Sequence, residues 1–145
     1  MQTDANGWVE YTVGDAPLII SAPHGGLLAP ASLPDRSCSV CILAGDDSTQ
    51  DLARRVAAQF LARTGKRAHL VINLLRRAKF DANREVVEAT GGNATLTATW
   101  TAYNGFIEGA RGRITTVPGR GLLLDLHGHG HSIPRLELGY LISAA

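Results

Sequence analysis

Three short apolar runs, each ending at a polar loop, constrain the fold of this chain more than any other feature. They are PLIISA (17–22), AHLVINLL (68–75) and GLLLDL (121–126). Continuous runs of Val, Ile and Leu, without polar alternation, are typical of strands that are buried on both faces of a parallel sheet. Further strands are predicted over residues 8–13 and 135–143.

Helical patterns separate these runs. From Asp46 onward, apolar residues recur every four positions as far as Phe60, and Gly65 stands where such a helix would end. A second helix is predicted over residues 95–110. Alternating strands and helices predict an α/β fold with helices on both faces of the sheet. The length suits one domain, so residues 1–145 are treated as a single unit.

Charge and hydropathy exclude several classes of protein. The net charge of +1 gives no basic face for nucleic acid. No run reaches the roughly 18 apolar residues of a membrane span, and the first residues, MQTDANGW, lack the pattern of a signal peptide. We therefore expect a soluble, cytoplasmic protein. Cys38 and Cys41 form a single CxxC motif. A zinc ribbon needs a second such pair, which the sequence lacks, so structural zinc is not expected here; a redox-active pair is the other interpretation of the motif.

Polar residues gather where the apolar runs end. His24 follows the first run, the DANR of residues 81–84 follows the second, and His127 follows the third. Open α/β sheets bind ligands beyond the carboxyl ends of their strands. Catalytic zinc takes three protein ligands, commonly His nitrogen and carboxylate oxygen. His24, His127 and either Asp46 or Asp47 would supply that set.

Each histidine also has a purely structural explanation. A single His at a strand end is more often a surface or hydrogen-bonded residue than a ligand. His129 and His131 lie in the same loop as His127, and we prefer His127 because it directly follows the strand. Asp125 is expected either to orient a side chain of the site or to pair with an arginine.

Two further pairs of residues are candidates for binding and catalysis. Asn83-Arg84 could read a carboxylate, because arginine offers a planar fork of donors; an ion pair of Arg84 with Asp81 or Glu85 is the alternative. Arg135 and Glu137 lie two apart on the strand predicted over 135–143, so both could face the site. Arg135 would bind substrate, and Glu137 would act as general base.

Taken in order, SAPHGG, DDSTQDLA, DANR, LLLDLHGHGH and RLELGY resemble motifs of the N-formylglutamate amidohydrolase family. The resemblance extends from about residue 17 to 142. That family is similar to zinc carboxypeptidases and succinylglutamate desuccinylases. The resemblance implies a three-layer α/β/α sandwich with a mixed, mostly parallel sheet, of the phosphorylase/hydrolase-like kind.

The resemblance also implies a ligand set and a substrate anchor. Asp46 is preferred to Asp47 because it keeps an Asp-x-x-Thr spacing to Thr49. The metal would be Zn2+, although the same donors accept other divalent ions. The implied ligands are His24, Asp46 and His127, and the implied anchor is Asn83-Arg84.

The expected activity is zinc-dependent hydrolysis of an N-acyl, formyl-like amide bond in a carboxylate-bearing amino acid. A carboxypeptidase-like metallopeptidase and a non-catalytic ligand-binding or assembly domain are the alternatives. The partners expected are a small N-acyl amino acid or peptide, with no nucleic acid and no membrane; self-association stays open. Members of the family are longer, so we expect the chain to be either a minimal version or C-terminally shortened. In the second case the general base would lie in the missing C-terminal elements instead of at Glu137.

Overall fold

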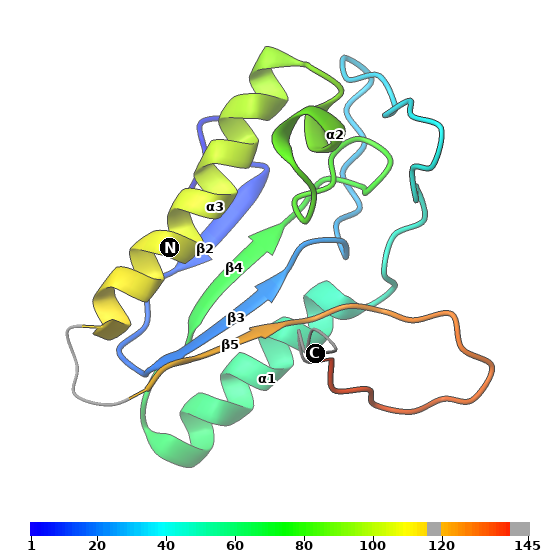
Figure 1. The fold of residues 1–145 in the computed structure, drawn as a ribbon. Coiled ribbons are helices and arrows are strands. Elements are labelled where there is room, and N and C mark those ends of the chain that lie inside the picture. Colours follow the sequence, from blue (N-terminus) through cyan, green and yellow to red (C-terminus); the bar gives the residue numbers. More distant parts are fainter. Residues whose placement is uncertain (116–119, 140–145) are drawn as a thin grey trace, which may run out of the picture.

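A computed structural model describes residues 1–115 and 120–139 as one mixed five-stranded sheet with helices packed on it (Figure 1). The α/β prediction is therefore confirmed. The strands are β1 (Gln2–Thr3), β2 (Val9–Thr12), β3 (Leu18–Ala22), β4 (His69–Asn73) and β5 (Leu122–Asp125). The helices are α1 (Thr49–Thr64), α2 (Val86–Thr90) and α3 (Ala94–Thr115).

The strand order is β1-β2-β4-β3-β5. The three apolar runs form the parallel part of this sheet, because β3 pairs in parallel with β4 on one side and with β5 on the other. Strand β2 runs antiparallel to β4, and β1 antiparallel to β2. All five residues of β3 and all five of β4 are buried, as expected for central strands covered on both faces. The predicted burial is wrong for the third run: β5 is an edge strand of the described sheet, and Leu122 and Leu123 are 55% and 45% exposed.

The two faces of the sheet carry separate apolar clusters, and α1 and α3 lie on opposite sides of it (Figure 1). Because side chains alternate along a strand, neighbours such as Ile19 and Ile20 point to different helices. Ile19 packs in the cluster that includes Tyr103 of α3, whereas Ile20 packs in the cluster that includes Ala53 of α1. Each fully buried Ile contributes about 1.5–3 kcal/mol, which fixes the register of the strands and hence of the loops that follow them.

The boundaries differ from the predicted ones in instructive places. Helix α1 begins at Thr49 and not at Asp46. The preceding Ser48 has a left-handed backbone conformation (φ 63°), which cannot be part of a right-handed α-helix. Its end is as predicted: Gly65 has φ 69° and its N–H bonds to Leu61 O, 2.8 Å away. Strand β1 and helix α2 were not predicted.

The strand predicted over 135–143 is wrong for the part that the structure describes. Residues 135–139 pair with no strand, and Leu136 and Leu138 are 95% and 80% exposed. An apolar alternation forms a strand only where a neighbour accepts its backbone hydrogen bonds, and none is available to this segment within the described ranges. The rest of the predicted strand, 140–143, lies outside the described residues.

Cys38 and Cys41 are joined by a disulfide in the loop between β3 and α1. Within residues 1–115 and 120–139, no helix has the length and apolar character needed to cross a membrane.

Candidate metal centre

The parallel register brings the two predicted histidines together. Ser21 of β3 lies opposite Asp125 of β5, and His24 and His127 follow these residues by three and two positions. The loop before α1 is tied to the same place, because the backbone N–H of Asp46 donates to the carbonyl oxygen of His24 at 3.1 Å. Three segments that are distant in sequence therefore meet beyond the carboxyl ends of β3 and β5.

Gly25 allows the start of α1 to lie close to this point. A Cβ atom at Gly25 would stand 2.6 Å from both the backbone nitrogen of Gln50 and Oγ1 of Thr49. Any larger residue would push the first turn of α1 away from β3. The glycine in SAPHGG is therefore explained by close packing, which holds the Asp46 segment against His24.

Three donor atoms converge at the centre of this arrangement. His24 Nδ1 lies 3.2 Å from Asp46 Oδ2 and 3.2 Å from His127 Nδ1, and His127 Nδ1 lies 3.3 Å from Asp46 Oδ2. Two ligands at about 2.0–2.1 Å from a tetrahedral zinc ion stand about 3.3–3.4 Å apart. The spacing of the three atoms therefore fits one face of a zinc tetrahedron, with the fourth position left for water or substrate.

Asp81 fixes which nitrogen of His24 faces the centre. Its Oδ1 lies 2.7 Å from His24 Nε2, and both side chains are buried. Burial works to raise the pKa of Asp81, but the hydrogen bond and charge of His24, and then those of Arg77, outweigh it and hold the pKa below its ordinary value. Because Asp81 is thus ionised, His24 Nε2 carries a proton, and Nδ1 is the nitrogen that can bind a metal.

His127 is oriented in the same way from the other strand. Its Nε2 lies 2.8 Å from Asp125 Oδ2, and Asp125 Oδ1 accepts a hydrogen bond of 2.6 Å from the hydroxyl of the buried Ser21. Each imidazole therefore has a carboxylate behind it and its Nδ1 in front. Carboxylate–histidine pairs of this kind commonly stand behind zinc in proteins.

We expect pH to control the site through His127. The hydrogen bond to Asp125 raises the pKa of His127 above its ordinary 6.5, against the opposing effect of burial. Because the pKa of His127 is higher in the folded protein than in the unfolded chain, protonated His127 stabilises the folded state. This stabilisation is fully present below pH 6.5 and is lost as the pH rises through the pKa of His127 in the folded protein. NMR titration of the His127 ring in metal-free protein should give a midpoint above 6.5 that Asp125→Asn lowers. A midpoint unaffected by Asp125→Asn would contradict the pairing.

Two buried arginines balance the carboxylates. Arg77 Nε lies 2.9 Å from Asp81 Oδ2, and its NH1 group lies 3.6 Å from Asp46 Oδ1. Arg36 places NH2 3.4 Å from Asp81 Oδ2 and donates to the carbonyl oxygens of Arg77, Ile42 and Glu88. Asp46 thus meets Arg77 with one oxygen and presents the other to the histidines.

Comparison of this chain with protein-family models, with curated proteins and with solved structures finds no match. The resemblance stated from the motifs therefore stays a prediction.

Asp81 and the two buried arginines were missed as supporting residues. The DANR motif marks this strand end, but from the sequence Asp81 is assigned only as a possible ion-pair partner of Arg84. A usable signal was present: an acid placed beyond a buried strand, four residues after Arg77, can hold an imidazole as readily as an arginine. Between the two adjacent acids, the structure places Asp46 beside the histidines and leaves Asp47 exposed.

Of the predicted Asn83-Arg84 anchor, only the asparagine contacts a candidate metal ligand. Asn83 Nδ2 is 3.4 Å from His127 Nε2, the ring nitrogen that faces Asp125 and not the other two candidate ligands. Arg84 pairs with Glu88 at 3.1 Å and not with Asp81 or Glu85, and its NH1 donates to the carbonyl oxygen of Asn83. The Arg84 guanidinium, which was predicted to bind a substrate carboxylate, is thus already paired with the carboxylate of Glu88.

Glu137 and Arg135 lie together but apart from the three donor atoms. Arg135 Nε contacts Glu137 Oε1 at 2.6 Å, and His131 Nδ1 contacts the same oxygen at 2.7 Å. Among the described residues, no polar contact joins Glu137 to His24, Asp46 or His127. The hydrogen bonds from Arg135 and His131 lower the pKa of Glu137, so its carboxylate is ionised and able to accept a proton.

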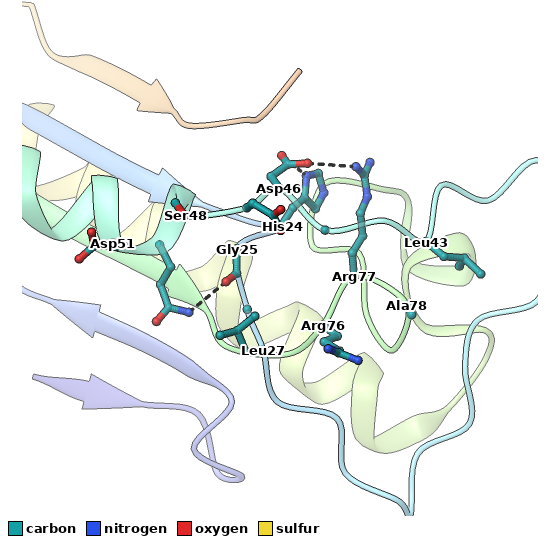
Figure 2. A pocket seen from close by; sticks show the side chains of 14 residues that line it. His24, Gly25, Leu27, Leu43, Asp46, Ser48, Asp51, Arg76, Arg77 and Ala78 are labelled. Atoms are coloured by element: carbon teal, nitrogen blue, oxygen red, sulfur yellow. Dashed lines mark hydrogen bonds and ion pairs between the residues drawn. The ribbon is translucent and has the colours of Figure 1, made fainter. Parts of the chain in front are cut away.

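A cavity of about 450 Å³ opens beside the centre and shares His24 and Asp46 with it (Figure 2). The loop after β3, the start of α1 and the segment after β4 form its walls. Its other lining residues are Gly25, Gly26, Leu27, Leu43, Gly45, Asp47, Ser48, Gln50, Asp51, Arg76, Arg77 and Ala78.

Proposed function

We propose that this protein is a zinc-dependent amidohydrolase that cleaves an N-acyl, formyl-like amide bond of a carboxylate-bearing amino acid. One observation carries the proposal. His24 Nδ1, Asp46 Oδ2 and His127 Nδ1 converge at 3.2–3.3 Å, while the second nitrogen of each imidazole is tied to a carboxylate. The finer fold assignment, a three-layer α/β/α sandwich of the hydrolase kind, belongs to the same proposal and is supported by helices on both faces of the sheet.

The donor set favours zinc over harder ions. Two imidazoles and one carboxylate suit zinc and its transition-metal neighbours, whereas magnesium and calcium prefer sites made of oxygen alone. When bound, zinc would supply Lewis-acid polarisation of the amide carbonyl and would lower the pKa of a water.

The chain's own residues prepare the site for this chemistry. Asp81 and Asp125 hold the two imidazoles with Nδ1 forward, so little reorganisation is needed when a metal binds. Asp46 is the one anion among the three donors, which leaves a positive site with a divalent ion and favours the approach of an anionic substrate.

Glu137 is proposed as the general base that accepts a proton from the attacking water. Its carboxylate is ionised, but it is held by His131 and Arg135. The role therefore requires the loop after β5 to bring Glu137 to the three donor atoms when substrate binds. Such closing movements are common in enzymes that exclude water from the reacting groups.

Hydrolysis of N-formyl-L-glutamate by zinc-loaded protein, measured as formate release, tests the activity. We expect turnover that a chelator removes and added zinc restores. Glu137→Gln should lower kcat by about 10²–10⁴-fold with unchanged zinc content, since a general base contributes about that much. Glu108→Gln, an exposed acid of α3 that pairs with Arg111, is the matched control and should be neutral.

Other outcomes identify the alternatives. Cleavage of peptides without cleavage of N-formyl or N-acyl amino acids would make the protein a metallopeptidase built on the same site. Full zinc binding with no hydrolysis of either class would overturn the enzyme proposal and leave a non-catalytic binding domain.

A further inference from the structure

We propose that Cys38 and Cys41 form a site of reversible thiol–disulfide exchange, and that its redox state sets the zinc affinity of the metal centre through Arg36 and Asp81. The co-reactant is a small thiol of the glutathione class. The exchange itself is independent of the proposed function, whereas its effect on zinc rests on the zinc site of that function.

The disulfide does little to hold the fold together. Cys38 and Cys41 are three positions apart. A cross-link stabilises a protein mainly by closing a loop, and the effect decreases as the loop becomes shorter. Neither cysteine is buried, and residues 29–48 contain no helix or strand. The bond is therefore local and accessible to reagents in solution, which is typical of disulfides that are exchanged and not of those that staple a core.

The two sulfur atoms have different surroundings. Cys38 is exposed, whereas Cys41 is partly covered and its Sγ lies 3.7 Å from NH1 of Arg36. A thiolate attacks the more accessible sulfur and expels the sulfur on which negative charge is better stabilised. The incoming thiolate therefore attacks Cys38 Sγ, and Cys41 leaves as a thiolate beside the Arg36 guanidinium.

Two molecules of the small thiol complete the reduction. The first, as a thiolate, forms a mixed disulfide with Cys38 while the bond between the two cysteines breaks and Cys41 takes its electron pair. The second thiolate attacks the sulfur of the first molecule, releases Cys38 as a thiolate and departs as the oxidised dimer. Two electrons pass to the protein, and the two protons of the small thiols go to the cysteine sulfurs or to solvent.

Arg36 connects the cysteine pair to the metal centre. Its side chain is only 2% exposed, and its NH2 group donates to the carbonyl oxygen of Ile42, the residue after Cys41, at 2.8 Å. The same NH2 group lies 3.4 Å from Asp81 Oδ2, and Asp81 Oδ1 lies 2.7 Å from His24 Nε2. One buried guanidinium therefore contacts both the loop of the disulfide and the carboxylate behind a candidate metal ligand.

Arg36 is also fixed from outside that loop. Its Nε donates to the carbonyl oxygen of Arg77 at 3.0 Å, and its NH1 group donates to that of Glu88, in α2, at 3.2 Å. The loop passes beside α2 on its way from β3 to α1 (Figure 1). Because the guanidinium is held on several sides, a change of charge at Cys41 acts on a group that cannot simply turn away into solvent.

Reduction changes the charge that Arg36 meets. The disulfide sulfur of Cys41 is neutral, whereas a thiolate at Cys41 attracts the guanidinium and competes with Asp81 for it. Asp81 then depends more on Arg77 alone and holds His24 Nε2 less firmly. The reduced protein should bind zinc about tenfold more weakly, at the lower end of the effect of groups that support a metal ligand.

Thiol counting tests the exchange. The sequence contains two cysteines, so the number of reactive thiols should rise from zero to two per chain when glutathione replaces glutathione disulfide, and should fall again when the buffer is reversed. Brief exposure to glutathione, stopped with acid, should place the mixed disulfide on Cys38, which fragmentation of the peptide in a mass spectrometer locates. A mixed disulfide on Cys41, or a thiol count that does not follow the buffer, overturns the exchange site.

Calorimetric zinc titration tests the coupling to the metal centre. Oxidised protein is compared with protein reduced by a phosphine that is removed before the titration. Two variants form a matched pair, since both lack the disulfide but only Cys38→Ser keeps a sulfur beside Arg36. Cys38→Ser should show the roughly tenfold weaker affinity of the reduced protein, and Cys41→Ser the affinity of the oxidised protein. Equal affinities in the two variants overturn the coupling.

Hydrogen exchange separates this inference from the proposed function. The backbone N–H of Asn83 donates to Asp81 Oδ1 at 3.1 Å, so its exchange with deuterium follows Asp81 without any metal. It should be faster in metal-free Cys38→Ser than in metal-free Cys41→Ser. If this difference is found but no zinc binds, the coupling stands and the proposed function is wrong. If zinc affinity and hydrolysis of N-formyl-L-glutamate are the same in both redox states, the activity stands and the coupling is wrong.

Discussion

Replacing His24 by alanine is expected to reduce zinc binding from one ion per chain to a trace. His24 supplies one of the three converging donors, and it is the most deeply buried of them, at 1% exposure. Loss of a residue that only supports a ligand lowers metal affinity about 10–100-fold, so loss of the ligand itself should exceed about a hundredfold. Metal analysis after dialysis and calorimetric titration of metal-free protein would measure the change.

The control for this variant comes from a second group of donors. His129, His131 and Glu137 also place ligand atoms within 4.8 Å of one another, but all three residues are exposed. His131→Ala should leave the zinc content unchanged. Retention of zinc in His24→Ala together with its loss in His131→Ala would move the site to this exposed group. Circular dichroism of both metal-free variants shows whether each one is folded.

The convergence of His24 and His127 could be foreseen because it follows from backbone rules. Continuous apolar runs predicted buried parallel strands, and parallel strands bring their carboxyl ends to one edge of a sheet. The two residues are 103 positions apart, yet the register of β3 on β5 leaves them in contact. The same packing explains why Gly25 leaves no room for a side chain: the start of α1 lies so close to the end of β3 that a Cβ atom there would clash with it.

The choice between Asp46 and Asp47 needed the structure. Both acids stand before the same helix in the sequence, and either could have faced the crevice. The decisive contact is a single backbone hydrogen bond from Asp46 N to His24 O, together with the left-handed residue Ser48 that ends the loop. Such loop geometry leaves no periodic signal in the residues. The motif spacing to Thr49 favoured Asp46 only through a resemblance.

Side-chain pairing was also beyond the sequence. Arg84, Arg76 and Arg77 all lie near the same strand end, and charge alone does not say which of them is neutralised within the chain. Arg84, just before α2, pairs at 3.1 Å with Glu88, which lies within that helix four residues later. The strand predicted over 135–143 failed for a related reason: its alternating residues were read correctly, but a strand requires a partner that no local pattern reveals.

Replacing Asp81 by alanine should produce the largest loss of stability in the metal-free protein. Asp81 is 1% exposed and accepts hydrogen bonds from His24, Arg36, Arg77 and the backbone N–H of Asn83. Its removal leaves the buried guanidinium of Arg36 without its carboxylate partner and leaves Arg77 with only the 3.6 Å contact to Asp46. Breaking a buried ion pair from one side costs about 3–5 kcal/mol. Urea unfolding at neutral pH measures this loss, because a pKa below 3.8 keeps Asp81 ionised and its contribution intact there.

Two further variants separate charge from simple loss of contacts. Asp51→Ala removes an exposed acid whose i,i+4 pair with Arg55 lies at the surface, and it should change the free energy of unfolding by less than about 0.5 kcal/mol. Asp81→Asn keeps the shape and one acceptor oxygen but not the charge, so it should fold and show zinc affinity about 10–100-fold lower. An Asp81→Ala protein as stable as the Asp51→Ala control would contradict the buried network. Wild-type zinc affinity in Asp81→Asn would show that the charged carboxylate at Asp81 is not needed to turn His24 Nδ1 toward the metal. The orientation of the His24 ring would then have to be set by the backbone alone.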